Sequence, residues 1–198
     1  FARIAPSVEL DRAPYVTIDD EAAAREVAAH LWGLGHRSIG FARGRDDHPS
    51  AVARRKGFTE ALADLGCAGV IEAPAKFQFE IGIEAARTLM ASPTPPTAIF
   101  AANDDSAAGV MAGLAQLGLR VPDDVSVVGF DDSWIAMSVW PYLTTIHQPI
   151  AEMAEVAMHE KCRKNNEQNT DDHPSNRAPL TVNAITGDEC NARSPKNK

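Results

Sequence analysis

The feature that most constrains the fold of this 198-residue chain is a regular alternation of short apolar runs with longer stretches of helical periodicity. The apolar runs are rich in β-branched and aromatic residues, which predicts buried strands. In the stretches between them, apolar residues recur at helical spacing, and each stretch ends at glycine or proline. We expect helices in these intervening stretches, and strands at residues 15–18, 38–42, 68–73, 98–102 and 125–130.

This alternation predicts the fold class. Strands that alternate with amphipathic helices are joined as right-handed βαβ units. Such units build a parallel sheet with helices on both faces. The sequence therefore predicts an α/β fold with a doubly wound, mostly parallel sheet. In such sheets ligands bind beyond the carboxyl ends of the strands, so the residues just after each strand are the first candidates for a binding site.

Charge and composition exclude several partners. The formal net charge is -8, and a surface that acidic does not attract the phosphate backbone of DNA. No apolar run approaches the roughly 20 residues needed to cross a bilayer, and the N-terminus shows no signal peptide. The three cysteines are an odd number at wide spacing, which is typical of a reduced, cytosolic setting. We therefore expect a cytoplasmic protein without membrane contact.

Three polar residues near predicted strand ends suit a small ligand. Asn103 follows the strand at 98–102, and its amide can both donate and accept. Asp131 follows the next strand, and its carboxylate can accept from hydroxyls or bind a cation. Arg54 lies near the start of an earlier helix, and its planar fork suits a carboxylate or paired sugar oxygens. Each also has a purely structural interpretation, as a turn residue, a helix cap or an exposed basic side chain.

Aromatic residues add two further candidates. Phe77 and Trp134 lie in predicted loops near the same edge of the sheet, where an aromatic face can stack on a sugar or a nucleobase. Core burial explains Phe77 as well. The segment 133–140 is unusually apolar, so it marks an interface if its side chains are exposed, or a packed loop if they are not.

Signatures of enzymes and metal sites are missing. Gly33-Leu34-Gly35-His36 precedes a strand, whereas a dinucleotide fingerprint follows one. The sequence has no phosphate-loop Gly-Lys-Ser/Thr and no Gly-x-Ser-x-Gly elbow. Neither Asp46-Asp47-His48 nor His159 with Cys162 supplies a full set of metal ligands. We expect no enzymatic activity, no cofactor and no metal.

Several segments together resemble the LacI/GalR family of bacterial transcriptional regulators. They occur in the family's order and spacing, from about Tyr15 to about Met158. The segments that carry the resemblance are Ile18-Asp19-Asp20, Leu34-Gly35-His36-Arg37-Ser38-Ile39-Gly40-Phe41, Arg54-Arg55-Lys56-Gly57-Phe58, Pro96-Thr97-Ala98-Ile99-Phe100-Ala101-Ala102-Asn103-Asp104, residues 118–132 and Leu143-Thr144-Thr145-Ile146-His147-Gln148-Pro149.

The resemblance implies two similar α/β subdomains like those of periplasmic sugar-binding proteins, with a helix-turn-helix before them that this chain does not contain. Residues 1–17 would be a remnant of the first subdomain and crossing segment, and 18–144 the second, effector-binding subdomain. Residues 145–161 would return to the first subdomain. Residues 162–198 would form a polar loop, a last strand near 180–185 and a frayed tail.

Site residues and partners also follow from the resemblance. It implies that Arg54, Asn103 and Asp131 contact the effector and that Phe77 lines the pocket, with Trp134 as a further candidate. The expected partners are a small sugar-like or nucleobase-like effector, a second copy of the chain, and operator DNA through the helix-turn-helix alone. The residues expected at the dimer interface are Trp134, Val139, Met111 and Leu114.

One alternative has the same fold. A periplasmic solute-binding protein of a sugar transport system shares the Asn103-Asp104 motif. Residues 118–132 and 144–149, and the missing leader, favour the regulator. A nucleotide-using enzyme with a doubly wound sheet is a remote third, because every phosphate-loop signature is missing.

Overall fold

A computed structural model of the chain describes residues 3–4, 15–167 and 180–182. These residues form two compact units. The first unit lies within Phe1–Asp19 and Gln148–Ala184, and the second lies within Asp20–His147. Among the described helices none is both long and apolar enough to cross a membrane.

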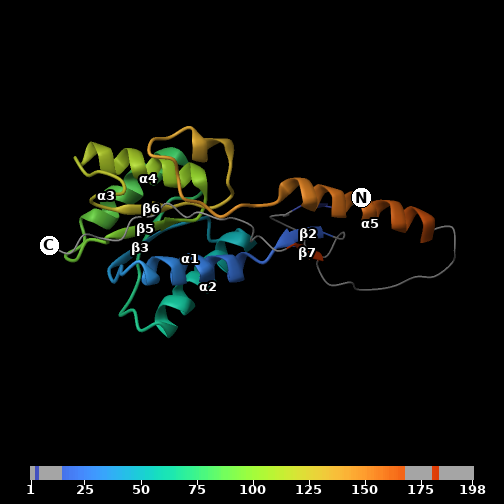
Figure 1. The fold of residues 1–198 in the computed structure, drawn as a ribbon, viewed down its shortest axis with the longest axis horizontal. Helices are drawn as coiled ribbons and strands as arrows, with labels where there is room; N and C mark the ends of the chain where they lie inside the picture. Colours follow the sequence, from blue (N-terminus) through green and yellow to red (C-terminus); the bar gives the residue numbers. More distant parts are fainter. Residues whose placement is uncertain (1–2, 5–14, 168–179, 183–198) are drawn as a thin grey trace. The chain divides into compact units, whose positions relative to one another are not determined.

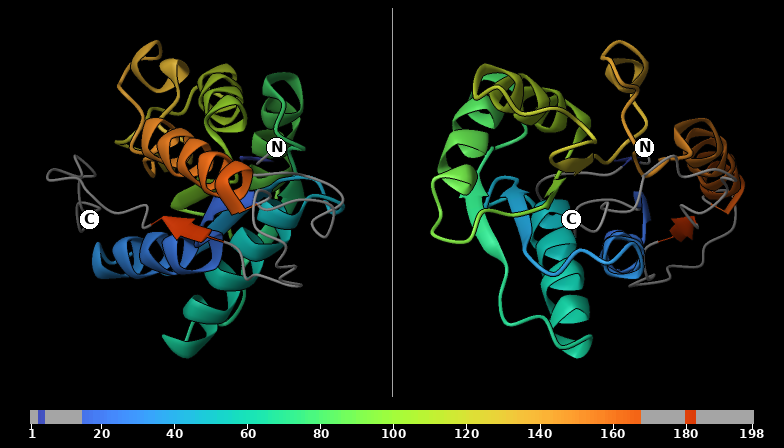
Figure 2. Two further views of the ribbon diagram at one scale, coloured as in Figure 1. Left: turned by 90° about the vertical axis from the view of Figure 1, so that its right-hand side faces the viewer. Right: turned by 60° about the vertical axis from the view of Figure 1, so that its left-hand side comes forward.

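The second unit is a four-stranded parallel sheet between two pairs of helices. Its strands lie in the order β4 (Ile71–Pro74), β3 (Ile39–Arg43), β5 (Ala98–Ala101) and β6 (Ser126–Val128). Helices α1 (Asp20–Gly33) and α2 (Pro49–Asp64) cover one face, and α3 (Phe79–Met90) and α4 (Asp104–Gln116) cover the other (Figure 1, with further views in Figure 2). The predicted fold class, a doubly wound parallel sheet with helices on both faces, is confirmed.

An aromatic cluster fixes α2 against its face of the sheet. Phe41 and Phe100 are partners in the register of β3 and β5, and their rings stack with centroids 5.2 Å apart. Phe58 of α2 packs on both rings, at 5.5 and 4.8 Å. Arg54 lies one helical turn before Phe58, so it shares the sheet-facing side of α2 and reaches the carboxyl ends of the strands.

The helices of each pair approach backbone to backbone at glycine. A Cβ added at Gly57 of α2 would overlap the carbonyl oxygen of Glu21 in α1. A Cβ at Gly109 of α4 would overlap the carbonyl oxygen of Phe79 in α3 and lie 3.0 Å from the Cα of Gly82. Backbone atoms have no rotamer to change, so these contacts require glycine for steric reasons.

The first unit contains a separate parallel sheet. Its strands lie in the order β1 (Arg3–Ile4), β2 (Tyr15–Ile18) and β7 (Leu180–Val182), and α5 (Ile150–Glu167) packs on β1 and β2. The sequence predicts one sheet from Tyr15 to Phe130. The prediction of one continuous sheet is wrong, because β2 pairs with β1 and β7 instead of with β3.

The predictions for the C-terminal part of the chain agree with the structure only in part. The polar loop is predicted to begin at residue 162, but α5 continues to Glu167. The last strand is found as β7, over the first three residues of the predicted 180–185. The rest of the predicted polar loop and tail, residues 168–179 and 183–198, lies outside the described residues.

Candidate functional site

Arg54 joins three parts of the second unit at the carboxyl edge of its sheet. Its Nε donates to Oδ1 of Asp20, the first residue of α1, at 2.8 Å. Its Nη1 donates to the carbonyl oxygen of Ala102, just after β5, at 2.6 Å. The same Nη1 lies 3.3 Å from Oδ1 of Asp131, which follows β6. The partners of Arg54 thus lie up to 77 positions from it in the sequence.

Burial makes this arrangement energetically important. The side chains of Arg54 and Asp20 are 5% and 8% exposed, whereas that of Asp131 is 31% exposed. The guanidinium carbon of Arg54 lies 3.6 Å from the ring centroid of Phe130, which adds a cation–π contact. A buried charge is tolerated only when it is paired and hydrogen-bonded. Arg54 meets that requirement through the hydrogen bonds of Nε and Nη1, and the Phe130 ring covers one face of its guanidinium.

Asn103 is the N-cap of α4. Its Oδ1 accepts a hydrogen bond from the backbone N–H of Ser106 at 3.0 Å, and its Nδ2 donates to Asp105 at 3.4 Å. The structural role of Asn103 is therefore that of a helix cap, and not only of a turn residue before the helix. The residue before it, Ala102, supplies the carbonyl that Arg54 binds, so the cap lies at the same edge as the Arg54–Asp131 pair.

Asp131 adopts an unusual backbone conformation at the same edge. Its φ is 115°, and that of Asp132 is 54°, both in the region that L-residues rarely occupy. Parallel bridges to residues 144–147 hold this segment, and the Asp131 N–H donates to the carbonyl of Ile146 at 2.8 Å. Strained residues of this kind concentrate at functional sites, where the surrounding structure maintains them.

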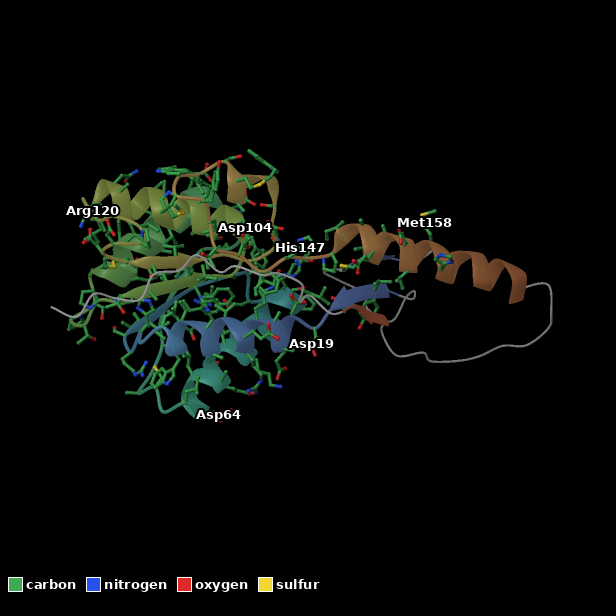
Figure 3. All side chains as sticks on the ribbon, viewed as in Figure 1. Asp19, Asp64, Asp104, Arg120, His147 and Met158 are labelled. Carbon is green, nitrogen blue, oxygen red and sulfur yellow. The ribbon has the colours of Figure 1, made fainter. Side chains whose placement is uncertain are left out.

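A buried carboxylate, that of Asp104, stabilises the segment that follows Asp131. Asp104, at the start of α4 (labelled in Figure 3), is fully buried. It accepts from Thr145 Oγ1 at 2.6 Å and from the Ser133 N–H at 2.7 Å. Burial raises the pKa of the Asp104 carboxyl, and the hydrogen bonds from Thr145 and Ser133 act in the opposite direction. Asp104 therefore binds residues near both ends of the loop that begins at Asp131, Ser133 and Thr145.

Sequence reasoning missed the roles of Asp20 and Asp104. In the sequence each is sufficiently explained as a residue at the start of a helix. Their partners are Arg54 and Thr145, which lie 34 and 41 positions away. The one available signal was their place directly after predicted strands, where functional side chains gather in such folds.

The two aromatic candidates lie in different surroundings. Phe77 is half-buried at φ 64°, its ring packs against Gly44, and it meets the His48 ring edge-on at 5.3 Å. Burial lowers the pKa of His48, and the positive charge of Arg54 lowers it further. Trp134 is 76% exposed, and the contacts of the described residues do not bring it to Arg54.

The residues expected at the dimer interface divide into two groups. Met111 and Leu114 are buried in the core of the second unit, so they offer no surface to a partner and their assignment is wrong. Val139 packs partly against the same core. Trp134 and Trp140 remain, at 76% and 83% exposed. Two further exposed apolar side chains lie beside them, Met137 and Tyr142.

A groove of about 720 Å³ lies elsewhere on the second unit, over α2 and the ends of β3 and β4. Its lining contains Arg43, Arg55 and Lys56, each of which is paired with an acidic residue. Arg54, Asn103 and Asp131 are not part of it. Within the described part of the chain, no three acidic, histidine or cysteine side chains gather as metal ligands would.

Known proteins resemble this chain along most of its length. Residues 28–184 match the family described as Periplasmic binding protein-like domain. Catabolite control protein A of Priestia megaterium is 35% identical over 161 residues, covering 78% of this chain and 48% of the relative. The Ribose operon repressor of Escherichia coli strain K12 is 35% identical over 161 residues, covering 77% and 49%. The chain thus spans about half the length of these curated relatives.

A solved structure agrees with these relatives. A LacI transcriptional regulator from a Rhodococcus species superposes with a TM-score of 0.78 and 34% sequence identity. The superposition covers 92% of this chain and 65% of that one.

Proposed function

The chain belongs to the LacI/GalR family by its periplasmic binding protein-like domain, and from this premise we propose that it is the effector-sensing part of a cytoplasmic transcriptional repressor. The effector is sugar-like or nucleobase-like and binds at the carboxyl edge of the second unit's sheet. The observation that carries the proposal is the convergence of Arg54 and Asp131 there, with the Asn103 cap beside them. The named curated relatives are a control protein and a repressor, which favours regulation over transport.

The proposed residues have complementary chemistry. Asp131 supplies an acceptor for ligand hydroxyls, Asn103 an amide that donates and accepts, and Arg54 a fixed cation that orients Asp131. Phe77 is proposed to offer an aromatic face to the same ligand. Effector binding then shifts the population between conformations with different affinities for operator DNA. DNA contact is made by a helix-turn-helix outside these residues, because a net charge of -8 repels the phosphate backbone.

The test is Asp131→Ala in a full-length protein that joins this chain to its DNA-binding region. We expect effector binding to weaken by about tenfold to a hundredfold, since a charged hydrogen bond contributes about 1–3 kcal/mol. Operator binding without effector is expected to stay as in the wild type. Both are measured by titrating operator binding with the effector.

The matched control is Asp132→Ala. Asp132 also has a positive φ, but it is 44% exposed and pairs with His147 instead of Arg54. We expect effector affinity to change by less than about threefold in this variant. Equal losses in both variants, or a wild-type response from Asp131→Ala, would remove Asp131 from the proposed site.

We propose in addition that the exposed loop carrying Trp134 and Trp140 forms a homodimer contact. The two rings are 76% and 83% exposed, which is an unusual surface for two tryptophans so close in sequence. Sedimentation of Trp134→Ser/Trp140→Ser is expected to show a dimer weakened at least about tenfold, because each aromatic anchor contributes about 2 kcal/mol or more. A variant dimer as tight as the wild type, or a wild type that stays monomeric, contradicts the proposal.

A further inference from the structure

Two backbone hydrogen bonds connect the strained segment at Asp131 to one buried carboxylate. Asp131 and Asp132 have φ angles of 115° and 54°, which persist only where the surrounding structure determines them. The N–H of Asp132 donates to Oγ1 of Thr145 at 3.3 Å, and that hydroxyl donates in turn to Oδ1 of Asp104 at 2.6 Å. The N–H of Ser133 donates to the other oxygen of Asp104, Oδ2, at 2.7 Å. Both oxygens of Asp104 therefore help to hold the residues that follow Asp131.

The same carboxylate approaches the chain just before Asp131. A Cβ added at Gly129 would overlap Oδ1 of Asp104 and would lie 2.7 Å from Cδ2 of Leu143. Gly129 is not among the glycines with a positive φ, so glycine is required here by space and not by backbone conformation. Asp104 thus fixes the course of the chain on both sides of Asp131, by close packing at Gly129 and by a hydrogen bond at Ser133.

The role of Asp104 differs from that of an ordinary acidic residue in the first turn of a helix. Such a residue accepts from the N–H groups of its own helix or interacts with the helix dipole from the surface. Asp104 is fully buried, and within the described part of the chain both of its oxygens accept from groups outside α4, Thr145 and Ser133. A short, buried side chain on a packed helix is a rigid support for the loop that it binds.

From these contacts we propose that Asp104 is the positioning residue of the candidate effector site. Its carboxylate holds the backbone at Asp131 in the conformation that brings the Asp131 carboxylate to within 3.3 Å of Nη1 of Arg54. Asp104 does not touch the ligand and acts on it through Asp131. The inference rests on the proposed effector-binding function and adds to it the residue that keeps the Asp131 acceptor ordered before the ligand arrives, which reduces the entropic cost of binding.

Amide hydrogen exchange of the ligand-free chain, followed residue by residue by NMR, tests this role. In the wild type the N–H groups of Asp132 and Ser133 are expected to exchange at least about tenfold more slowly than in an unfolded chain. Thr145→Val keeps the shape of the side chain and removes Oγ1, so both are expected to exchange at least about tenfold faster than in the wild type. The N–H of Asp131 is expected to accelerate as well, although its own acceptor, the carbonyl of Ile146, is unchanged.

Two substitutions of neighbouring chemistry are the controls. Thr145→Ser keeps the hydroxyl and is expected to restore slow exchange at all three amides. In Thr144→Val the side chain changes, but the backbone carbonyl that accepts from the Gly129 N–H at 2.8 Å remains, so exchange is expected to stay within about threefold of the wild type. The amides of Phe41 and Phe100, in β3 and β5, report on the whole unit and are expected to accelerate less than those of the Asp131 segment.

Gly129→Ala provides an independent variant. The added methyl group displaces the Asp104 carboxylate without removing any hydrogen-bonding group, so it is expected to accelerate the same amides at least about tenfold. This variant also serves if Thr145→Val fails to fold.

Four results would overturn the positioning role. They are wild-type exchange at Asp132 and Ser133 as fast as in an unfolded chain, an unchanged Asp131 amide in Thr145→Val, no recovery in Thr145→Ser, and acceleration as large at Phe41 and Phe100 as at Asp131. Because no ligand is present, any of these results leaves Asp131 as the proposed effector contact. A wild-type effector response from Asp131→Ala, in contrast, would contradict the proposed function and leave the exchange results as they are.

Discussion

Replacing Arg54 with Met is expected to lower the free energy of unfolding by about 3–5 kcal/mol, because it leaves Asp20 as a buried carboxylate without its cation. Met keeps the aliphatic stem and its packing on Phe130, so the loss reports the charge and its hydrogen bonds. Denaturant unfolding measures this loss of stability. The double variant Arg54→Met/Asp20→Asn is expected to recover a large part of the stability, since it removes the stranded charge as well.

The neighbouring residue is the control. Arg55 lies next to Arg54 on α2 and has an ion pair of similar length, 2.8 Å to Glu72, but its side chain is 55% exposed. Arg55→Met is therefore expected to cost no more than about 1 kcal/mol. Equal losses for Arg54→Met and Arg55→Met would show that burial of the Arg54 pair has no energetic consequence, against the account given above.

Gly109→Ala is expected to destabilise the second unit by about 1–3 kcal/mol or more. The added methyl group would overlap the carbonyl oxygen of Phe79, and α3 and α4 would have to separate. Alanine favours a helix over glycine by about 1 kcal/mol, so any measured loss understates the steric cost. Thermal and denaturant unfolding give the change in stability.

Gly33→Ala provides the matched comparison. Gly33 also lies in a helix, α1, and a Cβ there would meet no heavy atom within 4 Å. This variant is expected to be as stable as the wild type or more stable by up to about 1 kcal/mol. A Gly109→Ala protein that gains stability as Gly33→Ala does is incompatible with the close approach of α3 and α4.

The repeating strand–helix pattern was sufficient to predict the second unit. Periodicity located β3, β5 and their flanking helices, because a strand buried on both faces is continuously apolar. The pairing of β2 was not predictable in this way. A short apolar run does not indicate which strands it pairs with, and β2 pairs with β7, in which the partner of Val16 is Leu180.

Convergence of Arg54 and Asp131 could be expected from topology, since parallel strands end at one edge. The structure brings them to 3.3 Å. The pairing of Arg54 with Asp20 could not be expected from the sequence. Three adjacent basic residues, at positions 54–56, were equally good candidates, and only the packing of Phe58 determines which of them faces inward. Met111 and Leu114 show the converse problem, since an apolar stripe looks the same whether it faces a sheet or a partner.

The most direct test of the central claim is a crystal structure of the chain bound to a sugar that it binds in solution. The account predicts a ligand hydroxyl within hydrogen-bond distance of the Asp131 carboxylate, a second polar contact at Asn103, and the Arg54–Asp20 bond still in place at about its present 2.8 Å. A sugar bound elsewhere, such as in the groove over α2, would contradict this account.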